Sequence, residues 1–170
     1  MKKITAEEII DLISLPLTDI KVIETLDALG IEQPVLDEEY KMEGELWTEG
    51  EEKIGVAILF AESDMRRDDG EPLVEQIDFY HEEKVPFPLG LHKSDGYETV
   101  IKKLGRKPDF CIKLTPWRKQ WVFPFDDKEL VYAIHFKSNM KSIDSLVVAE
   151  FDRESVEKDE FVFPCSELEK

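Results

Sequence analysis

The side chains best suited to catalysis or metal binding are three histidines, His81, His92 and His135. Their spacing predicts neither a catalytic site nor a metal site. None has a second histidine three or four residues away, the separation that sets two metal ligands on one face of a helix. His81 begins the segment His-Glu-Glu-Lys-Val, which lacks the second histidine of a zinc-protease helix. Each histidine is therefore interpreted as a core or surface residue.

The two cysteines, Cys111 and Cys165, also lack metal-ligand spacing and are typical of a protein in a reducing compartment. The sequence contains no phosphate-binding loop and no dinucleotide-binding glycine pattern. We therefore predict no catalytic residue, no metal ion and no cofactor, and a chain that is not an enzyme.

An acidic segment between Glu62 and Pro72 resembles a calcium loop only faintly. Its acids and one glycine do not have the EF-hand spacing, which requires a glutamate at the twelfth position. The segment is more informative as part of an uneven distribution of charge along the chain. Residues 37–84 contain 17 acids and 5 bases, a net charge of −12, whereas residues 85–149 contain 7 acids and 11 bases, a net charge of +4.

This asymmetry predicts a binding surface in the first half of the chain. A formal charge of −17 disfavours nucleic acid and anionic membranes, and it favours a basic protein partner. A concentrated acidic field speeds association with such a partner and orients it. The alternative is a solvated acidic surface that only keeps the protein soluble. The candidate partner-binding residues are Glu49, Glu51, Glu52, Asp64, Asp68, Asp69 and Glu71.

Helices and strands must position these acids. A Thr5–Glu8 capping box predicts a helix over residues 6–14, and a second helix begins near Asp19 and ends at Gly30. A third follows the candidate caps Ser94 and Asp95 and ends at Gly105. Apolar runs and period-two alternation predict strands over residues 53–60, 73–80, 110–114, 120–125, 130–136 and 143–151. Pro124 indicates an edge or the end of its strand, and Phe161–Pro164 indicates a small extra strand or a docked segment.

The two halves of the chain repeat one another in order. Leu29-Gly30 corresponds to Leu104-Gly105, and Trp47 corresponds to Trp121. Residues 56–60 likewise correspond to 132–136. Such collinear self-similarity predicts an α+β fold of two tandem helix-plus-antiparallel-strand repeats that form one sheet with helices on one face. The expected organisation is one domain, 1–170, with repeats at about 15–84 and 85–151 and an acidic tail at 152–170.

The repeat also predicts which side chains form the core. We expect burial of Leu26, Leu29, Trp47, Val56, Ile58, Phe60, Ile77 and Phe79 in the first repeat, and of Val100, Leu104, Trp121, Tyr132, Ile134, Phe136, Val147 and Ala149 in the second. Trp47 has a second interpretation as an aromatic anchor at an interface, because tryptophan is enriched in interface hot spots. Its correspondence with Trp121 favours the core.

The helix-stop segment, PLGL followed by a Ser, then ETV and LGRKPD, precedes a tryptophan and paired strands. This pattern resembles small bacterial immunity proteins of the pyocin and contact-dependent growth inhibition type. The duplicated unit is also similar to β-lactamase inhibitory protein and to outer-membrane assembly lipoproteins. The resemblance covers about residues 15–151 and implies a protein that binds and neutralises a toxin domain, such as a basic nuclease. The absence of a lipoprotein signal departs from the assembly lipoproteins.

Two alternatives from other classes remain open. One is a small ligand-binding module or enzyme with a pocket between helices and sheet, and the other is an acidic nucleic-acid mimic. The N-terminal apolar run is interrupted by Glu7, Glu8 and Asp11, so it does not resemble a secretion signal. No stretch has the length of a membrane span. We therefore expect a cytoplasmic protein with no membrane association.

Overall fold

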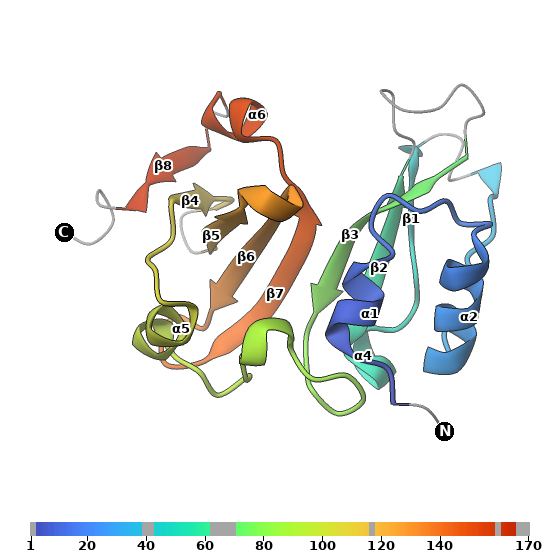
Figure 1. Cartoon of the computed structure of the whole chain (residues 1–170), viewed down its shortest axis with the longest axis horizontal. Coiled ribbons are helices and arrows are strands. Elements are labelled where there is room, and N and C mark those ends of the chain that lie inside the picture. The colour runs from blue at the N-terminus through green and yellow to red at the C-terminus, as the bar shows by residue number, and fades with distance from the viewer. Residues whose placement is uncertain (1–2, 39–42, 62–70, 116–117, 159–160, 166–170) are drawn as a thin grey trace. The chain divides into compact units, whose positions relative to one another are not determined.

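The structure is a computed structural model that describes residues 3–38, 43–61, 71–115, 118–158 and 161–165. It is a mixed α+β structure whose strand pairs are antiparallel (Figure 1). The α+β class with antiparallel strands agrees with the prediction from the sequence. The chain divides into two compact units, Met1–Val85 and Pro86–Lys170. The predicted repeat boundary, between residues 84 and 85, falls beside this division.

In the first unit, local capping signals fix the starts of the first two helices. Helix α1 (Ala6–Ile10) has the predicted capping box, in which the Thr5 hydroxyl accepts from the Glu8 N–H. It is shorter than predicted, because the N–H groups of Leu12 and Ile13 donate to carbonyls three residues back, at Ile9 and Ile10, rather than four. Helix α2 (Ile20–Leu29) begins at the Asp19 cap and ends at Gly30, whose φ of 72° is left-handed as expected.

Three antiparallel strands follow in the order β1-β2-β3: β1 (Glu45–Trp47), β2 (Val56–Ala61) and β3 (Leu73–Phe79). The predicted strand at residues 53–60 starts too early. Residues Glu51–Ile54 form helix α4 instead, because the Gly50 carbonyl accepts from the N–H groups of Ile54 and Gly55. Strand β1 was not predicted, since three residues in a charged segment give no clear alternation.

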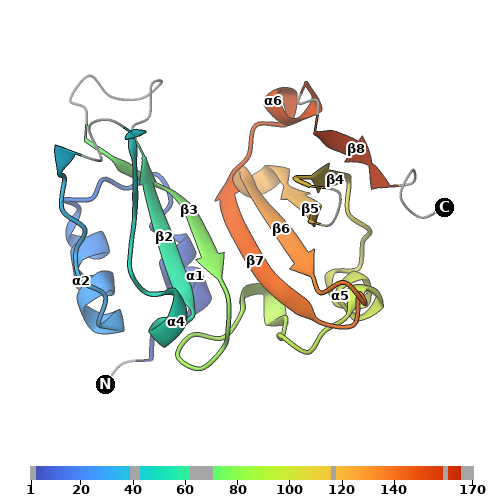
Figure 2. The same ribbon diagram turned by 180° about the vertical axis from the view of Figure 1, so that it is seen from behind.

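The two faces of this sheet differ. Helices α1 and α2 cover one face of this sheet, as Figures 1 and 2 show from opposite directions. We assign Val56, Ile58 and Phe60 to that face, because they alternate along β2 and have no exposed surface. Their partners Ile77 and Phe79 share that side and are also fully buried. Ala57 and Leu59 alternate with these residues and therefore belong to the other face, where they are also buried, at 5% and 6% exposed.

The second unit begins with the 3-10 turn η1 and helix α5, continues through four strands and ends with a short helix and a last strand. Its elements are η1 (Pro88–Gly90), α5 (Tyr97–Leu104), β4 (Phe110–Lys113), β5 (Lys119–Phe125), η2 (Asp126–Lys128), β6 (Leu130–Phe136), β7 (Ile143–Glu150), α6 (Arg153–Glu157) and β8 (Val162–Pro164). The strands lie in the order β7-β6-β5-β4-β8. The Phe161–Pro164 segment thus adds a strand, one of the two outcomes expected.

The N-cap of helix α5 lies one residue after Asp95, the later of its two predicted caps. Gly96 is the N-cap, and a Cβ there would lie 2.9 Å from the Met140 carbonyl oxygen, so the close approach of that loop requires glycine. Asp95 accepts from the His92 N–H at 2.8 Å and pairs with Lys103 at 2.7 Å. Ser94 and Asp95 are therefore not helix caps. The predicted stop is confirmed, since Gly105 is left-handed with a φ of 66°.

Pro124 lies inside β5 and opposite Val131 of β6. On its other side β4 reaches only to Phe110, which faces Val122. Pro124 therefore has no β4 partner, and the strand tolerates its missing N–H because the sheet is locally at an edge there.

The predicted core is largely buried, with one clear error. Buried as predicted are Leu26, Val56, Ile58, Phe60, Ile77, Phe79, Val100, Trp121, Tyr132, Ile134 and Val147. Leu29, Leu104, Phe136 and Ala149 are only partly buried. Trp47 is wrong as a core residue, because 42% of it is exposed.

Candidate partner-binding surface

The exposure of Trp47 follows from the register of β1. Trp47 lies opposite Leu59 of β2, and residues opposite one another point to the same side of a sheet. Leu59 belongs to the side that α1 and α2 do not cover. Trp121, its counterpart in the repeat, lies opposite Ile134 on the buried side of its own sheet and contacts the Tyr97 ring of α5 at 5.0 Å between centroids.

The two tryptophans thus differ by one position in strand register. In the repeat alignment Ile58 corresponds to Ile134, so a matching register would have placed Trp47 opposite Ile58. A shift of one residue moves a side chain to the other face, because strand side chains alternate with a period of two. Thr48 occupies the inner position instead. It is 6% exposed, and its hydroxyl accepts from the Ile58 N–H at 2.9 Å.

The acids next to Trp47 are held on a constrained connection. Gly50 and Gly55 flank α4, and a Cβ on Gly50 would lie 2.6 Å from the Val56 carbonyl oxygen. Gly55 has a φ of 81°, and its amide donates to the Gly50 carbonyl. The His81 Nε2 lies 3.0 Å from the carbonyl oxygen of Glu52. These contacts fix the turn that carries Glu49 and Glu52.

The predicted site residues divide into three groups. Glu49 and Glu52 are exposed, as a partner-binding role requires, and Glu51 is the first residue of α4. Glu71 lies two residues before β3 and accepts hydrogen bonds from the Thr18 N–H and hydroxyl. Asp64, Asp68 and Asp69 lie outside the described residues. Glu45 was not predicted; it is exposed and shares the face of Trp47, which only the register of β1 reveals.

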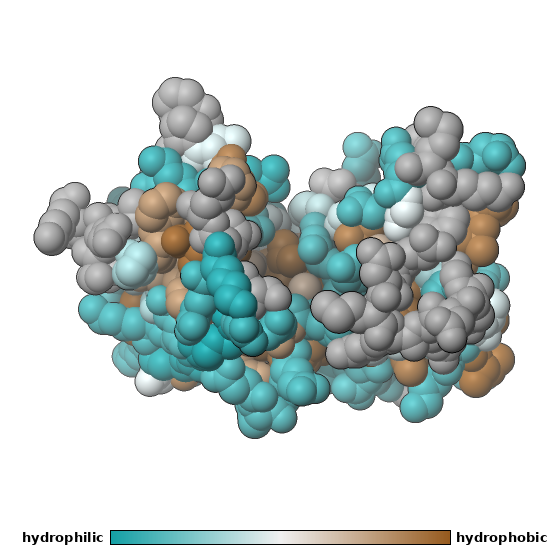
Figure 3. Space-filling model, turned by 90° about the horizontal axis from the view of Figure 1, so that it is seen from above, coloured by the Kyte–Doolittle hydropathy of each residue, from teal (hydrophilic) through white to brown (hydrophobic). Residues whose placement is uncertain are grey.

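The charge of the chain follows the division into units. Residues 1–85 contain 24 acids and 8 bases, a net charge of −16, whereas residues 86–170 contain 15 acids and 14 bases, a net charge of −1. The edge strand that exposes Trp47 therefore belongs to the acidic unit. Other hydrophobic side chains also reach the surface, and Figure 3 shows such residues among hydrophilic ones.

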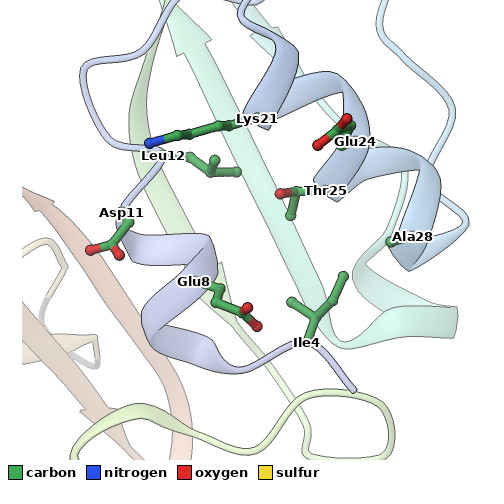
Figure 4. A pocket seen from close by; sticks show the side chains of 8 residues that line it. All are labelled: Ile4, Glu8, Asp11, Leu12, Lys21, Glu24, Thr25 and Ala28. Atoms are coloured by element: carbon green, nitrogen blue, oxygen red, sulfur yellow. The ribbon is translucent and has the colours of Figure 1, made fainter. Parts of the chain in front are cut away.

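A pocket of about 490 Å³ lies between α1 and α2 (Figure 4). Its lining combines three carboxylates, one ammonium group and apolar side chains: Ile4, Glu8, Asp11, Leu12, Lys21, Glu24, Thr25 and Ala28. Glu8 is already engaged by the capping box, where it accepts from the Thr5 N–H at 3.0 Å. None of the sheet residues that the structure describes lines this pocket, so it differs from the predicted pocket between helices and sheet.

The described residues include histidine, cysteine and acidic side chains that could in principle bind a metal ion. Nowhere among them do three or more histidine, cysteine or acidic side chains gather as metal ligands would. His135 is buried in β6, and desolvation lowers its pKa to about 4, aided by repulsion from Arg118. Within the same described ranges, no helix has the length and apolarity that crossing a membrane requires.

Comparison with known proteins bears on the fold alone. No model of a known protein family matches the chain, and no curated protein matches it. The chain is similar to the 1.5 Å crystal structure of an extracellular protein containing an SCP domain from Bacillus anthracis str. Ames, with a TM-score of 0.54 and 13% sequence identity. The match covers 93% of this chain and 49% of that one. The chain thus spans about half the length of the solved protein.

Proposed function

We propose that this chain is a bacterial immunity protein that binds a basic toxin domain, such as a nuclease, and blocks it by forming a tight complex. The observation that supports the proposal is the exposed Trp47 on an edge strand, with Glu45 beside it and Glu49 and Glu52 on the following turn. An aromatic side chain on a mostly acidic surface combines an interface anchor with long-range steering. The function needs no catalytic group.

Two further features of the resemblance belong to this proposal. The two units would be copies of one ancestral helix-and-strand repeat, since both contain a helix that ends at a left-handed glycine and then antiparallel strands. The copies would have diverged in charge, with binding assigned to the acidic first unit. An immunity protein acts where its own cell must be protected, so we place it in the cytoplasm.

The pocket between α1 and α2 supports a second candidate, a module that binds a small ligand with an apolar body and a cationic group. Leu12 and Ala28 would contact the apolar body, and Asp11 and Glu24 the charge. The −16 charge of residues 1–85 also fits a nucleic-acid mimic that occupies a nucleic-acid-binding protein. The toxin proposal differs from both alternatives because it alone predicts that this chain restores the growth of a cell that expresses the toxin domain.

The test takes the C-terminal domain of the protein encoded immediately upstream of this chain, where we expect the gene of the toxin. That domain is expressed from an inducible promoter with and without this chain, and growth and nuclease activity are followed. We expect this chain to restore growth and to form a purifiable complex in which the nuclease is inactive. Continued toxicity without a complex overturns the proposal.

Matched variants assign the surface. Trp47→Ala should weaken the complex by roughly 2 kcal/mol or more, the magnitude that defines a hot spot. Leu114→Ala is the control, because Leu114 is similarly exposed at 48% but lies in the second unit. Equal affinities for these two variants and the parent would exclude Trp47 from the interface.

A further inference from the structure

The backbone of β1 presents unused hydrogen-bonding groups along its outer edge. The Thr48 N–H donates to the Ile58 carbonyl at 3.0 Å, so residue 58 bonds toward β1. In an antiparallel pair such positions alternate, so Leu46 and Phe60 bond to each other as the next such pair. The N–H and C=O groups of Glu45 and Trp47 consequently point away from β2.

Strand β1 is the terminal strand of the first unit's sheet. Within the described residues, no hydrogen bond joins the outward groups of Glu45 or Trp47 to another element. An edge of this kind is a template on which another chain can extend the sheet. The same two residues carry the exposed acid and the exposed indole, so backbone and side-chain groups for recognition coincide.

We infer that a partner adds a strand to the outer edge of β1, and that this strand carries basic side chains at alternate positions. The inference rests on the proposed function and specifies how the partner is recognised. A strand paired with β1 places every second side chain on the face of Glu45 and Trp47. One basic group then lies opposite the Glu45 carboxylate, and the next lies over the Trp47 indole.

Both contacts are chemically matched. Opposite charges that face one another across two strands stabilise the pair. A cation over an indole is attracted by the negative face of the ring, and arginine is the commonest such cation. Glu49, two residues beyond Trp47, adds negative charge at the same end of the strand. The recognition element in the partner is therefore a three-residue pattern, in which the first and third residues are basic and the second can be any residue.

The first experiment uses a short acetylated peptide in which arginine and valine alternate. Its control is the same peptide with alternate backbone nitrogens methylated, which keeps the charge but removes one edge of N–H donors. Amide hydrogen exchange of the full chain is followed by NMR during titration. We expect the amides of Glu45 and Trp47 to exchange more slowly with peptide, that of Leu46 to stay unchanged, and the methylated peptide to bind roughly tenfold more weakly.

The second experiment changes the protein. Glu45→Pro removes one outward N–H and leaves the bonds to β2, because proline is tolerated on edge strands. Glu45→Gln is its control and removes only the charge. The proline variant should bind the peptide roughly tenfold more weakly than the glutamine variant. Equal affinity for both variants, equal affinity for both peptides, no peptide binding, or unchanged exchange at Glu45 and Trp47 overturns the inference.

The toxin domain is then used in place of the peptide, which separates this inference from the proposed function. A domain that binds and leaves the Glu45 and Trp47 amides unprotected overturns strand addition and supports the immunity function. A peptide that behaves as expected beside a domain that does not bind supports the edge site and overturns the immunity function.

Discussion

Trp47 of β1 lies directly opposite Leu59 of β2, and this pairing turns its indole away from α1 and α2. Trp121 occupies the corresponding place in the repeat but lies opposite Ile134, where it is 7% exposed. Two residues that the sequence treats as equivalent therefore have different environments. One is available to a partner, and the other supports a core.

This difference predicts unequal effects on stability. Trp121→Ala should lower the free energy of unfolding by about 3–5 kcal/mol, because it leaves a cavity beneath α5. Trp47→Ala should cost clearly less than Trp121→Ala, since 42% of Trp47 is already exposed. Urea unfolding of the two variants measures both values. Similar losses would place Trp47 in a packed environment.

Acids of the first unit should steer association. Replacing Glu49 and Glu52 by glutamine should slow binding of the toxin domain and flatten the dependence of the association rate on salt, with little effect on folding. The predicted triple variant of Asp64, Asp68 and Asp69 should act in the same direction. Stopped-flow kinetics at two salt concentrations is the measurement. A control pair in the second unit, Glu98→Gln with Asp127→Asn, should change the rate far less, and an equal effect would argue against a localised field.

The two left-handed glycines at Gly105 and Gly55 should differ in their tolerance of alanine. Nothing lies within 4 Å of a Cβ built on Gly105, so Gly105→Ala should cost only the backbone strain of about 1–2 kcal/mol. A Cβ on Gly55 would lie 2.4 Å from the His81 carbonyl oxygen. Gly55→Ala should therefore lose clearly more stability, as thermal unfolding would record. Unchanged melting of Gly105→Ala would mean that α5 ends elsewhere.

His135 should make the protein less stable in acid. Its pKa falls from 6.5 to about 4 through desolvation first and then repulsion from Arg118, while Asp144 and the backbone bond to Lys119 oppose the shift. Because the unfolded chain binds this proton at a higher pH than the folded chain does, the stabilisation is complete above pH 6.5 and is lost as the pH falls toward 4. We expect about 1–2 kcal/mol after allowance for screening by solvent. His135→Phe should remove this part of the pH dependence in urea titrations, and an identical slope for parent and variant would contradict it.

The two buried cysteines should form a disulfide under mild oxidation. Cys111 of β4 lies opposite Phe163 of β8, and Cys165 directly follows the last residue of β8. A hydrogen bond from the Cys165 side chain lowers the pKa of the Cys111 thiol, with burial opposing the shift. A small-molecule disulfide should therefore oxidise the pair and be reduced to two thiols in the process. Intact mass after alkylation detects the bond, and Cys165→Ser is the control. Retention of two alkylatable thiols would show that β8 holds the sulfurs apart.

Much of the fold could be predicted because its signals are local. The stops at Gly30 and Gly105, the capping box at Thr5, and strands such as Leu130–Phe136 depend on residues adjacent in sequence. The partition of charge between the two halves is likewise a property of the sequence. These features gave the α+β class and directed attention to the acidic first half.

The tertiary structure decided what depends on distant neighbours. Gly50 and its carbonyl convert the predicted start of a strand into α4, and the approach of Met140 makes Gly96 the cap of α5. The register of β1 was decided by the bonds between Thr48 and Ile58. Because strand side chains alternate, that single step turned Trp47, together with Glu45 two residues before it, to the outer face. Composition and self-similarity do not specify a register, so the candidate surface required the paired strands to be seen together.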